Sequence, residues 1–85
     1  MSYNVFIHPQ AIKFLRRTPR KDVERIKAKL QELTEPHAVR AVKLKGKNAF
    51  RVRVGDYRIL FTIDESKKVV VVVKIDKRSR VYDRI

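Results

Sequence analysis

The residues best suited to chemistry are arginines that alternate with apolar residues in the segment 50–61. Successive side chains of a β-strand point to opposite faces, so Arg51 and Arg53 share one face and the apolar residues between them share the other. The pattern turns at Gly55-Asp56 and resumes with Arg58, which predicts a β-hairpin. Guanidinium groups match phosphate geometry and stay charged at physiological pH, so several of them could stabilise the cleavage of a phosphodiester. The plainer alternative is an ordinary solvent-facing side of a sheet.

A second basic group lies near the C-terminus, where a tyrosine follows basic residues: Lys77, Arg78, Arg80 and Tyr82. A tyrosine in such a setting can stack on a nucleobase or contact a phosphate, as in proteins that bind single-stranded RNA. The alternative is that the Tyr82 ring packs on the core. The remaining lysines that we expect to contact RNA are Lys43, Lys45, Lys47 and Lys74.

The charge balance favours a polyanionic partner. The chain has 85 residues, the size of one small domain, so we expect a single domain over residues 1–85. Lysine and arginine total 22 against 9 acidic residues, a formal charge of +13, and 44% hydrophobic residues suffice for a packed core. Such one-sided charge favours a nucleic acid over a merely solvated basic surface. An acidic protein partner would satisfy the same charge.

Several kinds of site are excluded by what the sequence lacks. There is no cysteine, which excludes disulfides, thiol nucleophiles and cysteine-based zinc sites. No metal-ligand spacing, phosphate-binding glycine loop or Ser-His-Asp order is present, so we expect no metal and no cofactor. His8 and His37 stand alone beside prolines, where we expect helix caps or exposed rings. No signal peptide is visible and the longest apolar run, residues 69–73, is too short to cross a membrane, so we expect a cytoplasmic protein with no membrane partner.

Apolar spacing predicts one strand and two helices in the first half of the chain. Residues 3–7 alternate as a strand does, and His8-Pro9 ends that pattern. Pro9 suits the first turn of a helix, while Thr18 and Pro19 suit the N-cap and the first residue of a second one. The second helix carries a narrow apolar stripe and ends before Pro36; the stripe consists of Val23, Ile26, Leu30 and Leu33.

The second half predicts strands over residues 49–54, 57–63 and 68–75, with a short strand near 41–44. The fold class is therefore α+β. An N-terminal strand and a two-helix hairpin precede an antiparallel three-strand meander, which completes a roughly four-stranded sheet before a short basic C-terminal tail or helix. If the helices cover the fully apolar side, strict alternation leaves Val70 and Val72 as an apolar floor on the uncovered side. The charged residues expected on that uncovered side are Arg51, Arg53, Arg58, Lys74 and Arg78.

The combination of these segments resembles one protein family. Residues 50–61, the valine-rich strand ending in Ile75-Asp76-Lys77-Arg78, the upstream Leu44-Lys45-Gly46 and the final Val81-Tyr82 together resemble the RelE toxins of the RelE/ParE superfamily. The resemblance extends over essentially the whole chain, including the helical hairpin and the order of the strands. It implies a small α+β domain and the toxin of a type II toxin–antitoxin pair.

The resemblance also implies a reaction. RelE-like toxins enter the ribosomal A site and cut mRNA without a metal; the RNA 2′-hydroxyl is the nucleophile and a 2′,3′-cyclic phosphate is the product. By position, Arg51 and Arg53 match two basic strand residues of the family's site, and Arg58 matches its phosphate-binding arginine. Arg78 matches its late arginine, and Tyr82 matches its C-terminal tyrosine.

Two departures from the family pattern concern the chemistry. A well-known member has lysines at the first two positions, one of them regarded as the general base, whereas this chain has arginines. Arginine is a poor base because its pKa lies above about 12. The proton acceptor would then be Lys45, Lys47, Lys74, Tyr82 or a group of the ribosome. The stretch from Arg78 to Tyr82 is also shorter here.

The partners implied by the resemblance are an acidic RelB-like antitoxin, the ribosome with its mRNA, and operator DNA through the antitoxin complex alone. Two other functions stay open at this point. One is a ParE-like inhibitor of DNA gyrase, which binds without catalysis. The other is a non-toxic member that acts only in a repressor complex with its antitoxin.

Overall fold

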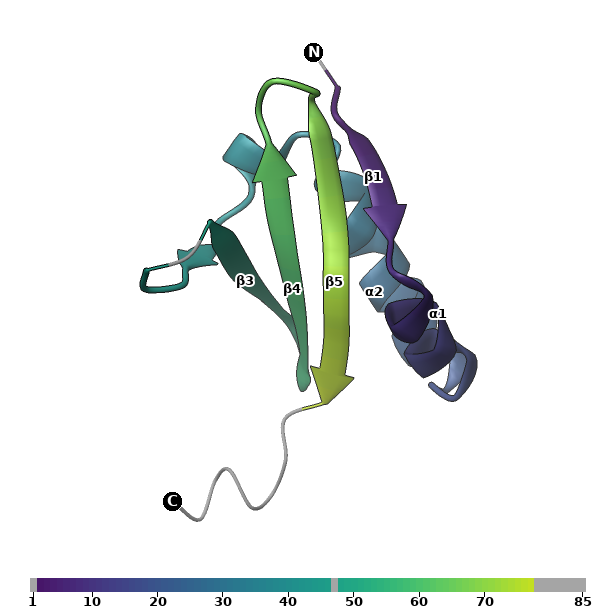
Figure 1. Cartoon of the computed structure of the whole chain (residues 1–85). Helices are drawn as coiled ribbons and strands as arrows, with labels where there is room; N and C mark the ends of the chain where they lie inside the picture. Colours follow the sequence, from purple (N-terminus) through teal and green to yellow (C-terminus); the bar gives the residue numbers. More distant parts are fainter. Residues whose placement is uncertain (1, 47, 78–85) are drawn as a thin grey trace.

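The chain forms one mixed sheet with helices on one side of it (Figure 1). The computed structural model describes residues 2–46 and 48–77. In chain order, the elements are β1 (Asn4–Ile7), α1 (Pro9–Arg16), α2 (Arg20–Glu32), a 3-10 turn η1 (Pro36–Ala38), β2 (Val42–Lys43), β3 (Ala49–Val54), β4 (Tyr57–Asp64) and β5 (Val69–Lys77). The sheet order is β1-β5-β4-β3-β2, and β1 pairs with β5 in parallel. The predicted fold class is confirmed, with the two-residue β2 adding a fifth strand.

Both helices begin near prolines, with one difference from the prediction. His8 is the N-cap of α1: its Nδ1 atom accepts a hydrogen bond from the Gln10 amide at 3.1 Å. The Thr18 hydroxyl is not the N-cap of α2, because it donates to the Phe14 carbonyl at 2.8 Å at the end of α1. Pro19 takes the N-cap position instead, so α2 begins one residue later than predicted.

The apolar stripe of α2 packs on the sheet as expected. Ile26 and Leu33 are fully buried and Leu30 is nearly so, while Val23 is half-buried. Their partners in the core come from alternate positions of the strands and include Phe61, Ile59, Val70 and Val72. This side of the sheet is therefore the hydrophobic core, and we call the opposite side the open face.

A β-bulge in β5 changes which of its residues face the core. Leu60 pairs with Lys74, but the next residue of β4, Phe61, pairs with Val72, which leaves Val73 as the extra residue. Because one extra residue exchanges the two faces, Val70 and Val72 are fully buried in the core. The prediction that they form a floor on the open face is wrong. The half-buried side chains of Leu60 and Val71 contribute to that floor instead.

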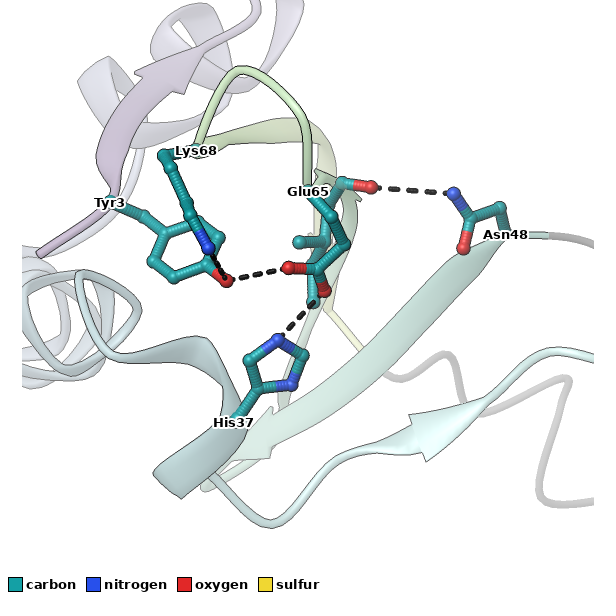
Figure 2. A network of polar contacts seen from close by, with 6 residues as sticks. Tyr3, His37, Asn48, Glu65 and Lys68 are labelled. Carbon is teal, nitrogen blue, oxygen red and sulfur yellow. Dashed lines mark hydrogen bonds and ion pairs between the residues drawn. The ribbon is translucent and has the colours of Figure 1, made fainter. Parts of the chain in front are cut away.

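A polar network closes the end of the sheet where β4 turns into β5 (Figure 2). The Tyr3 hydroxyl donates to Glu65 Oε1 at 2.6 Å, and His37 Nε2 lies 2.7 Å from Glu65 Oε2. The Lys68 ammonium lies 3.5 Å from the same hydroxyl and above the Tyr3 ring. We call these four residues the turn-end network. It joins β1 and η1 to the β4–β5 turn.

The hydrogen bonds of this network shift two pKa values in opposite directions. The pKa of Glu65 is lowered, mainly because the Tyr3 hydroxyl donates to its carboxylate and also because His37 does so. The pKa of Tyr3 is raised, mainly by the same hydrogen bond to Glu65. Both shifts favour the state in which a neutral tyrosine donates to an ionised glutamate.

Candidate functional site

Two rows of residues cross the open face at the end opposite the turn-end network. In the first row, Arg53 of β3 faces Arg58 of β4, which in turn faces Asp76 of β5. In the second row, Arg51 faces Leu60, which faces Lys74. Directly facing residues of antiparallel strands have Cα atoms about 4.5–5.5 Å apart, and their side chains leave the sheet on the same side. The rows therefore form one compact surface, which we call the cationic patch: Arg51, Arg53, Arg58, Lys74 and Asp76.

Local sequence explains why the patch is held rigidly. The turn between β3 and β4 has two residues, and Gly55 adopts a φ of +57°, a conformation that favours glycine. This short turn fixes the register in which Arg53 faces Arg58. On the opposite side of the same strands, Val52, Val54 and Ile59 are buried in the core. Because burial of these residues fixes the strands, the arginines project from a rigid backbone.

One carboxylate contacts the central arginine of the patch. Arg58 Nε donates to Asp76 Oδ1 at 3.0 Å, and Arg58 Nη2 donates to Asp76 Oδ2 at 3.3 Å. Paired hydrogen bonds of this kind fix the plane of the guanidinium group. Lys74 Nζ lies 3.9 Å from Asp76 Oδ2, at the limit of an ion pair. The side chains of Arg58 and Asp76 are 23% and 26% exposed, so solvent or a ligand can still reach both groups.

The patch carries more positive than negative charge. It contains four cationic side chains and a single carboxylate, and within residues 2–46 and 48–77 neither Arg51 nor Arg53 forms an ion pair. Cations held this close together repel one another and favour a bound anion. The fork shape of arginine suits phosphate oxygens in particular. Chemically, the arrangement can bind a phosphodiester and stabilise additional negative charge on it.

A hollow of about 330 Å³ adjoins the patch where α1 lies beside β5. Strand β1 pairs only with residues 69–72 of β5, so the rest of β5 is bordered by α1 instead (Figure 1). The hollow is lined by Gln10, Lys13, Phe14, Arg17, Lys74, Ile75 and Asp76. Asp76 therefore belongs both to the patch and to the wall of this hollow.

The predicted site residues divide into three groups. As predicted, the register brings Arg51, Arg53, Arg58 and Lys74 to one face. Three other lysines lie elsewhere. Lys43 faces Phe50, which packs against the core, so it lies on the opposite side of the sheet. Lys77 lies over the Tyr57 ring on that side, and Lys45 follows β2 in the loop. The remaining predicted residues lie outside the described part of the chain: Lys47, Arg78, Arg80 and Tyr82.

Sequence reasoning overlooked Asp76 as a site residue. Its position two residues after Lys74 was a usable signal, because period two puts the two on the same face. The residues of α1 that line the hollow, Lys13 and Arg17, gave no such signal, since only the folded chain brings α1 to β5. In the described ranges, no three histidine, aspartate or glutamate side chains lie close enough to hold a metal ion. None of the helices there is long and apolar enough to cross a membrane.

Several known toxins resemble this chain in sequence. Residues 5–82 match the sequence profile of the ParE toxin of type II toxin–antitoxin systems. Two proteins of Methanocaldococcus jannaschii named as RelE toxins are each 28% identical to this chain over 87 residues, covering 96% of it and 97% or 93% of theirs.

Solved structures extend the likeness to three dimensions. The RelE–RelB complex of Pyrococcus horikoshii matches with 30% identity and a TM-score of 0.81, over 94% of this chain and 99% of that one. Isolated RelE of Escherichia coli matches with 28% identity and a TM-score of 0.79, over 98% and 94% of the two chains. The chain therefore belongs to the ParE toxin family, and it is a RelE-type member of the RelE/ParE toxin superfamily.

Proposed function

We propose that this protein is a ribosome-dependent endoribonuclease that cuts mRNA in the ribosomal A site. The observation that carries the proposal is the row in which Arg53 and Arg58 face each other across two core-anchored strands. A gyrase inhibitor that only binds has no need of guanidinium groups gathered where one phosphate could be held. A nuclease that works without a metal does need them, because they must stabilise the charge that builds up on the phosphate.

The roles follow from position in the patch. Arg58 lies at its centre and would bind the scissile phosphate, while Arg51 and Arg53 would hold the neighbouring backbone phosphates. Arg78 and Tyr82 lie outside the described residues, and their roles come from the family resemblance: Arg78 would stabilise the transition state together with Arg58, and Tyr82 would stack on or orient the substrate. Of the lysines, Lys74 would contact the RNA from β5. Arginine also serves this purpose because it stays charged at any pH at which the ribosome works.

The partner that we propose is an acidic antitoxin of the RelB type. Relatives with 30% and 27% identity have been crystallised as RelE–RelB and RelBE complexes. The open face offers both kinds of surface that an amphipathic acidic segment needs. Phe6 of β1 is 58% exposed and pairs with Val71, and the cationic patch lies farther along the same face. Such a segment would cover the patch and so block the RNA site. DNA binding would then belong to the complex and not to this chain alone.

The match to the ParE profile supports a second candidate function, that of a gyrase inhibitor without nuclease activity. One experiment separates the two. The purified toxin is added to ribosomes programmed with a defined mRNA, and in parallel to a DNA gyrase supercoiling assay. We expect cleavage in the A-site codon that leaves a 2′,3′-cyclic phosphate, and no effect on supercoiling. An mRNA with a 2′-deoxynucleotide at the cleavage position is the matched control and should stay intact.

The opposite result would contradict the proposal. Intact mRNA together with inhibited supercoiling would assign the ParE activity. Intact mRNA with normal supercoiling, accompanied by operator binding only when the antitoxin is present, would assign the non-toxic repressor role.

A further inference from the structure

Cleavage by the RNA 2′-hydroxyl requires a group that accepts its proton. Arg51 and Arg53 occupy the positions from which the family's base would act, and a guanidinium group cannot accept a proton at neutral pH. Carboxylates can do so, and general-base catalysis by a well-placed carboxylate or imidazole contributes about 10²–10⁴-fold to a rate. A carboxylate base must lie beside the arginine that binds the phosphate.

Asp76 is the carboxylate that satisfies this geometry. It faces Arg58 directly across β4 and β5 and accepts two hydrogen bonds from it, at 3.0 and 3.3 Å. A phosphate oxygen bound by the outer edge of the Arg58 guanidinium would therefore lie close to the Asp76 carboxylate. Arg58 uses one position on each carboxylate oxygen, and a carboxylate has about four such positions in all. The remaining positions can accept a proton from a substrate.

Access to Asp76 is open from the side of α1. The side chain is 26% exposed and forms part of the wall of the 330 Å³ hollow. Lys13 and Arg17 line the same hollow, and Lys74 borders it from β5. These cations would attract a nucleotide to that side of Asp76. A ribose held there would have its 2′-oxygen next to the carboxylate and its 3′-phosphate next to Arg58.

The other carboxylates considered for this role either accept a hydrogen bond elsewhere or lie away from Arg58. Asp22 accepts a hydrogen bond from the buried Tyr57 hydroxyl at 2.8 Å on the helix side of the sheet. Asp64, which pairs with Val69, and Glu65, which follows it in the turn, lie at the far end of the strands. Asp56 lies in the exposed β3–β4 turn. Asp56 is nonetheless close enough in sequence to serve as a control.

We propose that Asp76 is the general base of the cleavage reaction, an inference that rests on the proposed nuclease function. A carboxylate oxygen of Asp76 takes the proton of the 2′-hydroxyl, and the 2′-oxygen forms a bond to phosphorus. The bond from phosphorus to the 5′-oxygen breaks, and that oxygen leaves with the electron pair and takes a proton from water. The products are a 2′,3′-cyclic phosphate and a 5′-hydroxyl. Arg58 stabilises the phosphate charge and holds the base beside it.

The test compares Asp76→Asn with wild type in single-turnover cleavage of mRNA on the ribosome, together with binding to a ribosome that carries the 2′-deoxy mRNA. We expect the variant to cleave about 10²–10⁴-fold more slowly. Its affinity should be equal or higher, because a negative charge has been removed beside a phosphate. Hydroxide can replace the missing base, so the variant's rate should rise about tenfold per pH unit near neutrality while the wild-type rate changes little. Asp76→Glu should recover part of the rate, and Asp56→Asn should behave as wild type.

Each other outcome overturns the inference in a recognisable way. Faster cleavage with tighter binding would mean that Asp76 only competes with phosphate for Arg58. Slower cleavage with weaker binding, no pH-dependent recovery and no rescue by Asp76→Glu would mean that it only orients Arg58. An unchanged rate would exclude any role in the reaction. If wild type itself leaves the mRNA intact, the proposed nuclease function fails, and this inference fails with it.

Discussion

Two polar clusters lie at opposite ends of the strands β4 and β5, and each cluster contains one carboxylate. In the turn-end network, Glu65 accepts hydrogen bonds from Tyr3 and His37, and Lys68 supplies one nearby positive charge (Figure 2). In the cationic patch, Asp76 accepts from Arg58 and lies near Lys74. The first cluster joins three segments that are far apart in the chain. The second joins neighbouring residues of adjacent strands that the backbone already holds together.

The difference between the clusters is one of charge balance. The turn-end network contains one carboxylate and one ammonium group, which both contact the Tyr3 hydroxyl, so their charges balance within the network. Among the described residues, the cationic patch sets four cations against one carboxylate, an excess that favours an external anion. Similar hydrogen bonds can therefore stabilise the fold at one end of the sheet and prepare a binding site at the other. Removal of a charge should therefore have different consequences at the two ends.

The largest expected effect follows from neutralising the centre of the patch. Arg58→Gln should lower the single-turnover rate of mRNA cleavage by about 10²–10³, the usual cost of losing one preorganised donor to a developing oxyanion. Lys68→Gln removes one positive charge from the turn-end network and should leave the rate unchanged. Thermal unfolding followed by circular dichroism verifies that both variants are folded. Equal losses of activity in both variants would remove the distinction between the clusters.

A smaller effect is expected on binding of the antitoxin. Arg53→Gln should weaken the affinity roughly fivefold, equivalent to about 1 kcal/mol for one partly exposed ion pair. It should also reduce the dependence of affinity on salt, because one fewer charge is screened. Titration calorimetry at several salt concentrations measures both quantities. Lys68→Gln is the control and should keep the wild-type salt dependence; if it changes the dependence as much as Arg53→Gln does, the antitoxin does not recognise the patch.

The smallest effect concerns stability in acid. Because the folded-state pKa of Glu65 is lowered, the folded protein binds this proton less tightly than the unfolded chain does. The stabilisation is therefore present above the ordinary carboxyl pKa of about 4.5 and is lost as the pH falls through the lowered value. We expect the melting temperature of Glu65→Gln to fall less steeply between pH 6 and pH 3 than that of wild type.

The control for this prediction is Glu24→Gln, which removes an exposed carboxylate of α2 that lies outside the network. The melting temperature of Glu24→Gln should fall as steeply between pH 6 and pH 3 as that of wild type. Identical profiles for wild type and Glu65→Gln would show that the network adds nothing to stability in acid.

Much of the fold could be predicted because its signals are local. The helices, the strands and the face shared by Arg51, Arg53 and Arg58 follow from apolar spacing and from a two-residue turn that fixes the register. The bulge could not be found in this way. A run of five valines, residues 69–73, contains no polar residue to show where the alternation slips. The one-residue slip exchanged the assigned faces of Val70 and Val72.

The parts of the sites that escaped prediction depend on contacts between distant segments. Tyr3 and Glu65 are 62 residues apart, and nothing in the local pattern of either residue indicates the other. The hollow beside β5 likewise needs α1 to lie where β1 stops pairing. Asp76 differs, because its face was predictable and only its contact with Arg58 was missing. Asp76 became a candidate general base once its hydrogen bonds to Arg58 were known.

Contact between Arg58 and the scissile phosphate can be tested by changing one group on each side of the interaction. A sulfur atom replaces one non-bridging oxygen of that phosphate, and single-turnover cleavage rates are measured for wild type and Arg58→Gln on both mRNAs. If the guanidinium binds that oxygen, the two changes remove the same interaction, and their combined effect will be much smaller than the sum of their separate effects on the activation free energy. Lys68→Gln should show simple additivity. Additive effects of Arg58→Gln with both sulfur isomers would contradict the assignment of Arg58 to the scissile phosphate.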